Sequence, residues 1–182
     1  MGAAAGRNRV AGVGAVNAPG RRGAGGGSVA IQDGLRDNWC WGCGSDNPEG
    51  LHLKSYWDGE LAVATFSPDA KFAAGPRHVL NGGLIATLLD CHGVCAAIAR
   101  TYDDEGRALG SDPDIWRATT AMTVQYLRPT PIDAELELTG RVSEAGDKVL
   151  TAECTLSAGG KERARATVAS ARVPEEWRHG MR

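Results

Sequence analysis

The sequence lacks several features that mark well-known classes of protein. It has no uninterrupted apolar run near the ~20 residues that a membrane-spanning helix needs, so we expect no membrane as partner. Lysine and arginine (20) do not outnumber aspartate and glutamate (22), which leaves no basic surplus for a nucleic-acid partner. Five cysteines are an odd and sparse set, unlike the dense pairs of a disulfide-stapled secreted domain. We therefore expect a cytoplasmic location.

Acidic residues are absent from the first 32 residues, which hold four arginines and nine of the 25 glycines. Such a segment has too few apolar side chains to join a core, so residues 1–32 are predicted to form a flexible tail. The remaining 150 residues are the size of one ordinary domain. Residues 33–182 are therefore predicted to form a single, mildly acidic domain.

Alternating apolar and polar residues predict strands in six places. Two short runs, residues 51–57 and 61–67, are separated by Asp58-Gly59, which is a strong hairpin signal. Four further runs come later in the chain, at residues 121–129, 134–142, 148–156 and 163–173. Between the two groups, residues 82 to about 102 have helical spacing and are apolar on nearly all sides, as in a buried helix. One antiparallel sheet wrapped around that helix covers it most simply, so the predicted fold is α+β.

Asp90 is the most informative residue because it lies in the middle of the apolar helix. Its neighbours one helical turn away include Ala86 and Val94, which cannot neutralise a carboxylate. An unpaired buried charge is costly or has a raised pKa. One alternative is that Asp90 lies on a narrow polar stripe facing solvent, and another is that it pairs with a distant arginine. The flanking sequence offers almost no polar stripe, so we interpret Asp90 as a functional carboxylate.

The segment His78-Val79-Leu80-Asn81-Gly82-Gly83 leads into the helix. A helix N-terminus presents unpaired N–H groups and a partial positive charge, and glycine lets a substrate carbonyl approach the backbone. The amides of Gly82 and Gly83 are therefore candidates for stabilising an oxyanion, with Asp90 about two turns further along as base or nucleophile. The alternative is that Asn81 and the glycines form only a turn and a helix cap.

Two segments, NGGLIATLLDCHG and TTAMTVQYLRPTP, resemble the PaaI-like acyl-CoA thioesterases of the hotdog superfamily. Those proteins have a His-Gly-Gly turn, a buried helix with a catalytic Asp, and a strand that ends in Tyr-x-x-Pro. The resemblance extends from about Cys40 to Val173 and includes CWGCGSDNPEGLHL, which is similar to a segment before the first strand of many members. It implies a hotdog fold and hydrolysis of an acyl-CoA thioester without a metal or redox cofactor. It also implies a homodimer or homotetramer, with each active site between subunits.

The resemblance also implies roles for individual residues. Asp90 matches the acid that attacks the thioester or activates water, and Gly83 or its neighbour Gly82 matches the backbone donor to the thioester carbonyl. In the expected oligomer, the acid and the glycine turn of one site come from different chains. Thr119 and Thr120 fall near the position where relatives place a Ser or Thr that helps to hold the attacking water.

The sequence departs from this family at Asn81, where histidine is usual. An asparagine side chain donates a hydrogen bond but cannot transfer a proton. His78 and His92 are candidates to take the place of the missing histidine. Asn81 also makes a second hypothesis reasonable, in which the protein binds acyl-CoA without hydrolysing it.

The cysteines offer a third hypothesis, a zinc-stabilised interaction module. Cys40 and Cys43 have metal-ligand spacing and, with Cys91, His92 and Cys95, can supply a tetrahedral site. A lone Cys-x-x-Cys is a weak motif, however, and cysteines on an apolar helix usually behave as small hydrophobic residues. A redox role is not expected either, because the segment after Cys43 cannot continue as a helix. We therefore predict no metal site.

Overall fold

The computed structural model describes residues 29–144 and 148–178, so most of the predicted tail lies outside the described residues. The predicted tail boundary at residue 32 is corrected by the structure, because Ala30, Ile31 and Gln32 are buried. Ile31–Gly34 form a short 3-10 helix, η1. The Gln32 side chain donates to Ser55 Oγ at 3.2 Å and accepts from the Ser55 amide at 2.8 Å. These paired hydrogen bonds join η1 to the sheet, so residues 30–32 pack with the domain.

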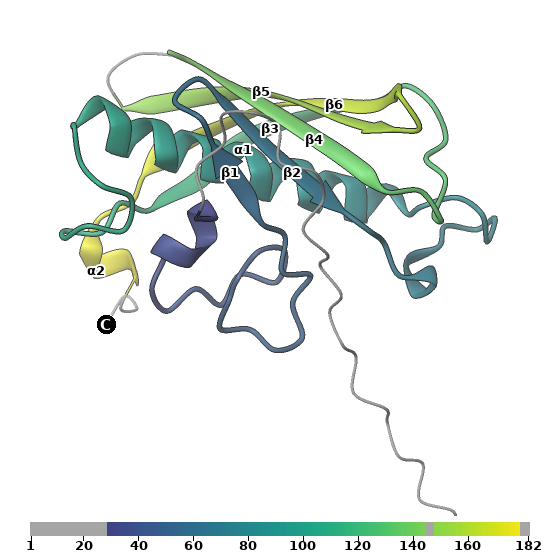
Figure 1. The fold of residues 1–182 in the computed structure, drawn as a ribbon, viewed down its shortest axis with the longest axis horizontal. Coiled ribbons are helices and arrows are strands. Elements are labelled where there is room, and N and C mark those ends of the chain that lie inside the picture. The colour runs from purple at the N-terminus through teal and green to yellow at the C-terminus, as the bar shows by residue number, and fades with distance from the viewer. Residues whose placement is uncertain (1–28, 145–147, 179–182) are drawn as a thin grey trace, which may run out of the picture.

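A long helix, α1 (Gly82–Asp104), runs along the inside of the sheet (Figure 1). Asn81 forms its N-cap, with Oδ1 accepting from the Gly83 amide at 2.8 Å. By length and composition α1 could cross a membrane, but 67% of its most apolar 18-residue window is buried within the domain. Such burial is typical of the core helix of a folded domain, and it agrees with the prediction from apolar spacing.

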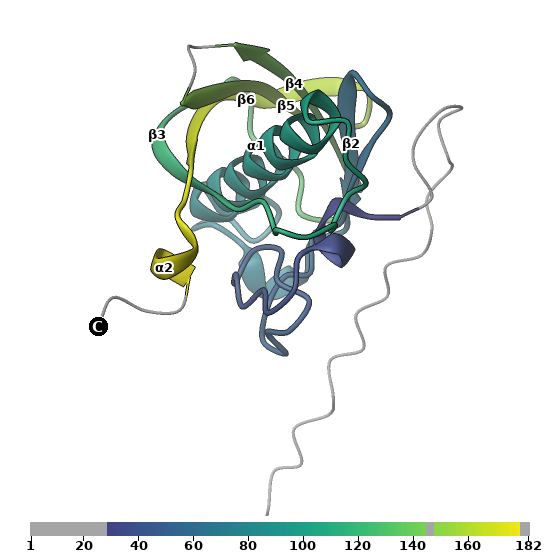
Figure 2. The same cartoon turned by 90° about the vertical axis from the view of Figure 1, so that its left-hand side faces the viewer.

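The strands form one antiparallel sheet in the order β1-β2-β4-β5-β6-β3. Their bounds are β1 (Ser55–Trp57), β2 (Leu61–Phe66), β3 (Arg117–Tyr126), β4 (Leu136–Glu144), β5 (Val149–Ala158) and β6 (Lys161–Arg172). The first predicted strand is much shorter than expected, and β3 begins earlier than expected. Figure 2 shows the sheet curving over α1. The predicted α+β hotdog arrangement, one sheet wrapped around one helix, is confirmed.

Small side chains on the inner face of the sheet let α1 approach closely. On β6, the inward-facing residues include Ala164, Ala166 and Val168, all of which are buried. A Cβ on Gly93 of α1 would lie only 2.8 Å from the Val168 side chain. The helix is therefore in tight contact with β6 at this point, and this contact fixes the position of residues such as Asp90 on the rest of the helix.

β3 is at one edge of the sheet, where it pairs with β6 on one side. The pairing register shifts between Thr119 and Ala121, which places a bulge at Thr120. A bulge redirects the side chains beside it. This irregularity lies where the start of β3 passes α1, so it influences which β3 side chains reach the helix.

Candidate active site

Asp90 and Thr119 meet where α1 passes the start of β3. The Thr119 hydroxyl donates to Asp90 Oδ1 over 2.6 Å. The next residue, Thr120, donates instead to the carbonyl oxygen of Ala169 on β6, at 3.2 Å. Of the two threonines named in the sequence analysis, the structure therefore brings Thr119 to the carboxylate and directs Thr120 to the sheet.

The Asp90 carboxyl is half-buried at a cavity of about 170 Å³, which Thr119 and Trp116 also line. Burial raises the pKa of Asp90, and the hydrogen bond from Thr119 opposes part of that rise. Among the described residues, no cation contributes to lowering this pKa. A carboxylate in this environment is a stronger base than an exposed one. It can accept a proton from water or attack an electrophilic carbonyl.

Two side chains, those of Asn81 and Tyr126, form hydrogen bonds with the glycine turn at the start of α1. The Gly83 amide donates to Asn81 Oδ1, so the helix cap occupies the N–H group that the resemblance assigns to the thioester carbonyl. The Gly82 amide has no hydrogen-bond acceptor among the described residues, and it is the better candidate for an oxyanion donor. Tyr126 donates its hydroxyl to the Gly82 carbonyl oxygen at 2.9 Å. Sequence reasoning missed this role of Tyr126, although its place in Tyr-x-x-Pro was a signal.

Asp90 and the glycine turn are separated along the same helix. Asp90 is eight residues after Gly82, which corresponds to about 12 Å along the axis at 1.5 Å per residue. The two groups of one chain therefore cannot contact the same thioester. The structure brings Asp90 and Thr119 together, but it leaves Asn81, Gly82 and Gly83 of the same chain at a distance.

The two candidate histidines have different positions. His92 is fully buried, with Nδ1 2.9 Å from Ser55 Oγ and Nε2 3.3 Å from the carbonyl oxygen of Ala62. Burial lowers the pKa of His92 to about 4, so it stays neutral in the core and does not take the place of the missing histidine. His78 is exposed in the loop before α1, where its carbonyl oxygen accepts from the Ile132 amide. It belongs with the glycine turn and not with Asp90.

Residues 38–46 fold against α1 next to Asp90 and gather cysteines from two parts of the chain. The Sγ atoms of Cys40, Cys43 and Cys91 all lie within 4.8 Å of one another. Cys95 lies one helical turn after Cys91 on α1 and lines the same cavity as these three cysteines. From the sequence these cysteines, with His92, were candidate ligands of one site, and no metal site was predicted because a lone Cys-x-x-Cys is a weak motif. Only a long-range contact brings them together, and nothing in the spacing of either pair indicates that contact.

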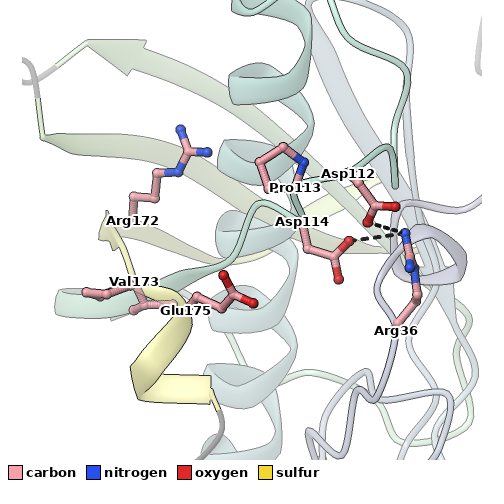
Figure 3. Close-up of a pocket in the computed structure, with 8 residues that line it drawn as sticks. Arg36, Asp112, Pro113, Asp114, Arg172, Val173 and Glu175 are labelled. Atoms are coloured by element: carbon pink, nitrogen blue, oxygen red, sulfur yellow. Dashed lines mark hydrogen bonds and ion pairs between the residues drawn. The ribbon is translucent and has the colours of Figure 1, made fainter.

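A larger cavity, of about 720 Å³, lies apart from Asp90 and shares no lining residue with its cavity (Figure 3). Arg36 lies on one side of it, where it pairs with Asp112 at 2.6 Å and with Asp114 at 3.4 Å, and Arg172 lies on the opposite side (Figure 3). Both carboxylates are thus engaged by a cation, whereas Asp90 is hydrogen-bonded to a neutral hydroxyl. The Asp90 cavity is therefore the candidate site.

Two comparisons with known proteins match this arrangement. A sequence model of the thioesterase superfamily matches residues 78–164, which include the glycine turn, Asp90 and Thr119. The crystal structure of a thioesterase superfamily protein from Shewanella loihica is 33% identical to this chain, with a TM-score of 0.53. The match covers 67% of this chain and 91% of that chain. A search of curated protein sequences gives no match.

Other solved structures share the fold at lower identity. The Escherichia coli PaaI protein from the phenylacetic acid degradation operon is 20% identical, with 68% of this chain and 81% of that chain covered and a TM-score of 0.56. A Streptococcus mutans protein bound to acetyl CoA is 18% identical, with 63% and 82% covered and a TM-score of 0.52. The Shewanella relative, at 33% identity over most of its length, goes beyond a likeness of fold. Together with the family match, it shows that the chain belongs to the thioesterase superfamily, as the hotdog resemblance predicted.

Proposed function

We propose that this protein hydrolyses an acyl-CoA thioester, with Asp90 as the base or nucleophile. The observation that carries the proposal is the half-buried Asp90 carboxylate, held by Thr119 at 2.6 Å beside a cavity on a thioesterase-superfamily fold. Membership of that superfamily supports thioester hydrolysis in general. The acetyl CoA in the Streptococcus mutans structure supports a CoA thioester as the substrate class.

The chemistry follows from the groups present. Asp90 accepts a proton from water while the oxygen of that water adds to the thioester carbonyl carbon. The Thr119 hydroxyl donates to Asp90, and its own oxygen can accept a hydrogen bond from the same water. A backbone amide stabilises the oxyanion. The C–S bond then breaks, and the CoA thiolate takes the proton from Asp90 and leaves a free acid. Direct attack by the carboxylate, followed by hydrolysis of the anhydride, gives the same products.

The proposed site needs a second copy of the chain. Asp90 and the Gly82 amide of one chain are about 12 Å apart, so the amide that meets the substrate comes from a partner. The edge strand β3 supports this assembly because its Met122 and Tyr126 are 37% and 55% exposed, and Leu127, which follows the strand, is 38% exposed. An unpaired edge with apolar side chains favours pairing with another chain. We therefore propose a homodimer or homotetramer.

The alternative, binding of acyl-CoA without hydrolysis, is favoured by one observation. Asn81 stands where the resemblance leads us to expect the usual histidine, and its Oδ1 accepts from the Gly83 amide. The two functions are distinguished by measuring free CoA by chromatography across a series of acyl chain lengths, which avoids reagents that react with the protein's own thiols. We expect steady release of CoA with at least one chain length. Calorimetric binding of acyl-CoA without release at any length would establish the binding function instead.

A further inference from the structure

We propose that Cys40, Cys43, Cys91 and Cys95 together bind one Zn²⁺ ion. The proposal goes beyond thioester hydrolysis and does not depend on it. It rests on the convergence of a Cys-x-x-Cys loop with Cys91 on α1, and on Cys95, which follows Cys91 by one turn and lines the same cavity. The fifth cysteine, Cys154 on β5, does not line the cavity that these four cysteines share.

The distances between the sulfur atoms fit a tetrahedral thiolate site. Zinc binds cysteine sulfur at about 2.3 Å, so two sulfurs of a tetrahedral site lie about 3.8 Å apart. Cys40 Sγ and Cys91 Sγ are 3.6 Å apart, and the three sulfurs of Cys40, Cys43 and Cys91 lie within 4.8 Å of one another. Cys95 lies one helical turn after Cys91 and lines the same cavity as the other three cysteines, so a change of its side-chain rotamer would supply the fourth sulfur.

Hydrogen bonds and close packing against α1 fix the backbone of the loop that carries Cys40 and Cys43. The Gly44 amide donates to the carbonyl oxygen of Cys40 at 2.7 Å, which closes a tight turn around Cys43. The Asn38 side chain accepts from the Cys40 amide at 3.1 Å. A Cβ on Gly42 would lie 2.4 Å from Cys91 Sγ, so only glycine lets the loop backbone rest against the helix here. The loop backbone thus holds Cys40 and Cys43 close to Cys91, and their proximity does not depend on side-chain rotamers alone.

The burial of these cysteines and the chemistry of their thiols favour a zinc site over a cluster of cysteines that only pack together. Cys43, Cys91 and Cys95 are buried, whereas Cys40 is exposed and gives an ion a route from solvent. Four thiols without a competing imidazole among them form the donor set of a closed structural zinc site. Binding replaces the four thiol protons with one Zn²⁺ and requires no oxidant. The ion would fasten residues 38–46 to α1 at the wall of the Asp90 cavity, which all four cysteines line.

The first test measures metal in the full-length protein. The chain is purified without an affinity tag in the presence of a reductant, and its metals are measured by plasma mass spectrometry. We expect about one zinc ion per chain. Cys43→Ser and Cys91→Ser should each lose the zinc, whereas Cys154→Ala, which removes a buried thiol outside the group, should retain it. A metal-free wild-type protein that also fails to take up added Zn²⁺, or one that holds iron instead, would overturn the proposal.

A second test uses the wild-type protein, so its result does not depend on whether the cysteine variants fold. Zinc is removed with a chelator under reducing conditions and replaced by Co²⁺. We expect the intense charge-transfer and visible bands of tetrahedral thiolate-bound Co²⁺, and a fall in Tm of about 5 °C or more on metal removal that added Zn²⁺ reverses. Cys95→Ser should weaken the bands, and unchanged bands would overturn its assignment as fourth ligand. A Cys40–Cys91 disulfide in place of metal, found by non-reducing peptide mapping, would contradict the whole site.

Discussion

At the scale of single residues, the reactivity of Asp90 depends on where its two oxygen atoms lie. One oxygen accepts from Thr119, and the carboxyl as a whole is half-buried beside the cavity. Burial keeps water and cations from stabilising the charged form, which raises the pKa of Asp90. This environment lowers the stability of the fold slightly and strengthens the base, a combination that is common where a charge has a function.

The first prediction concerns the carboxylate itself. Asp90→Asn keeps the side-chain volume but removes the base, so turnover under saturating acyl-CoA should fall by about 10² or more. Acyl-CoA affinity should hold, and the Tm should stay the same or rise because a buried charge is gone. Asp104→Asn is the matched control, since Asp104 is an exposed carboxylate on the same helix paired with Arg100. Wild-type turnover in a folded Asp90→Asn oligomer would exclude the proposed mechanism.

A second prediction concerns the hydroxyl that contacts Asp90. Thr119→Val keeps the shape of the side chain and removes its donor. A hydrogen bond to a charged group contributes about 1.5–3 kcal/mol, so kcat should fall by about 10–100-fold. Thr119→Ser should restore most of the rate, and Thr120→Val, whose hydroxyl bonds to the sheet, should change it little. Equal losses in Thr119→Val and Thr120→Val would indicate a structural effect of the bulge instead.

At the scale of elements, the first turn of α1 can be tested without disturbing the helix. Gly82 occupies the first helical position, where proline is well tolerated, and Asn81 already has extended backbone angles that suit a following proline. Gly82→Pro therefore removes one N–H group and little else. If this amide stabilises the oxyanion, kcat should fall by about 10²–10³. Gly82→Ala retains the amide and is the control. Full activity in a folded Gly82→Pro protein would assign the oxyanion to another donor.

Packing between α1 and β6 gives a prediction about stability. A methyl group on Gly93 would lie 2.8 Å from Val168 and 3.2 Å from Cys154, so Gly93→Ala overfills the core. Overpacking typically costs about 1–3 kcal/mol, which exceeds the gain of up to about 1 kcal/mol in helix propensity. We expect a lower midpoint in urea unfolding. Gly75→Ala, which meets nothing within 4 Å, should have almost no effect.

The sequence predicted those helices and strands that a local pattern of apolar and polar residues specifies. Apolar spacing located α1, and alternation located β4, β5 and β6 to within a few residues. Long-range contacts were not predictable in the same way. Gln32 belongs to a polar, glycine-rich stretch by composition, yet it is buried because Ser55 satisfies its amide. The meeting of Asp90 with Thr119 was suggested by the family resemblance alone, and the cysteine group depends on a loop whose path no periodicity describes.

At the scale of the whole molecule, the proposed site predicts complementation between inactive chains. Light scattering should give a particle of at least two 19.0 kDa chains. Asp90→Asn and Gly82→Pro homo-oligomers should both be nearly inactive. Mixed after mild unfolding and refolding together, they should regain a substantial share of wild-type activity, because a mixed dimer has one complete site. A monomer in solution, or no recovery in oligomers shown to be mixed, would contradict a site shared between chains.

The close contact between α1 and β6 also limits where the fatty or aromatic acyl group of a substrate can lie. Where Gly93 meets Val168 there is no room even for a methyl group, so an acyl chain cannot thread between the helix and the sheet at that point. In the proposed oligomer we expect the tail of the substrate to lie on the other side of α1, where Ala86, Thr87 and Val94 are only partly buried. In that proposed oligomer, we expect residues at the boundary between chains to set selectivity for substrate length, so that substitutions there change it without repacking the interior.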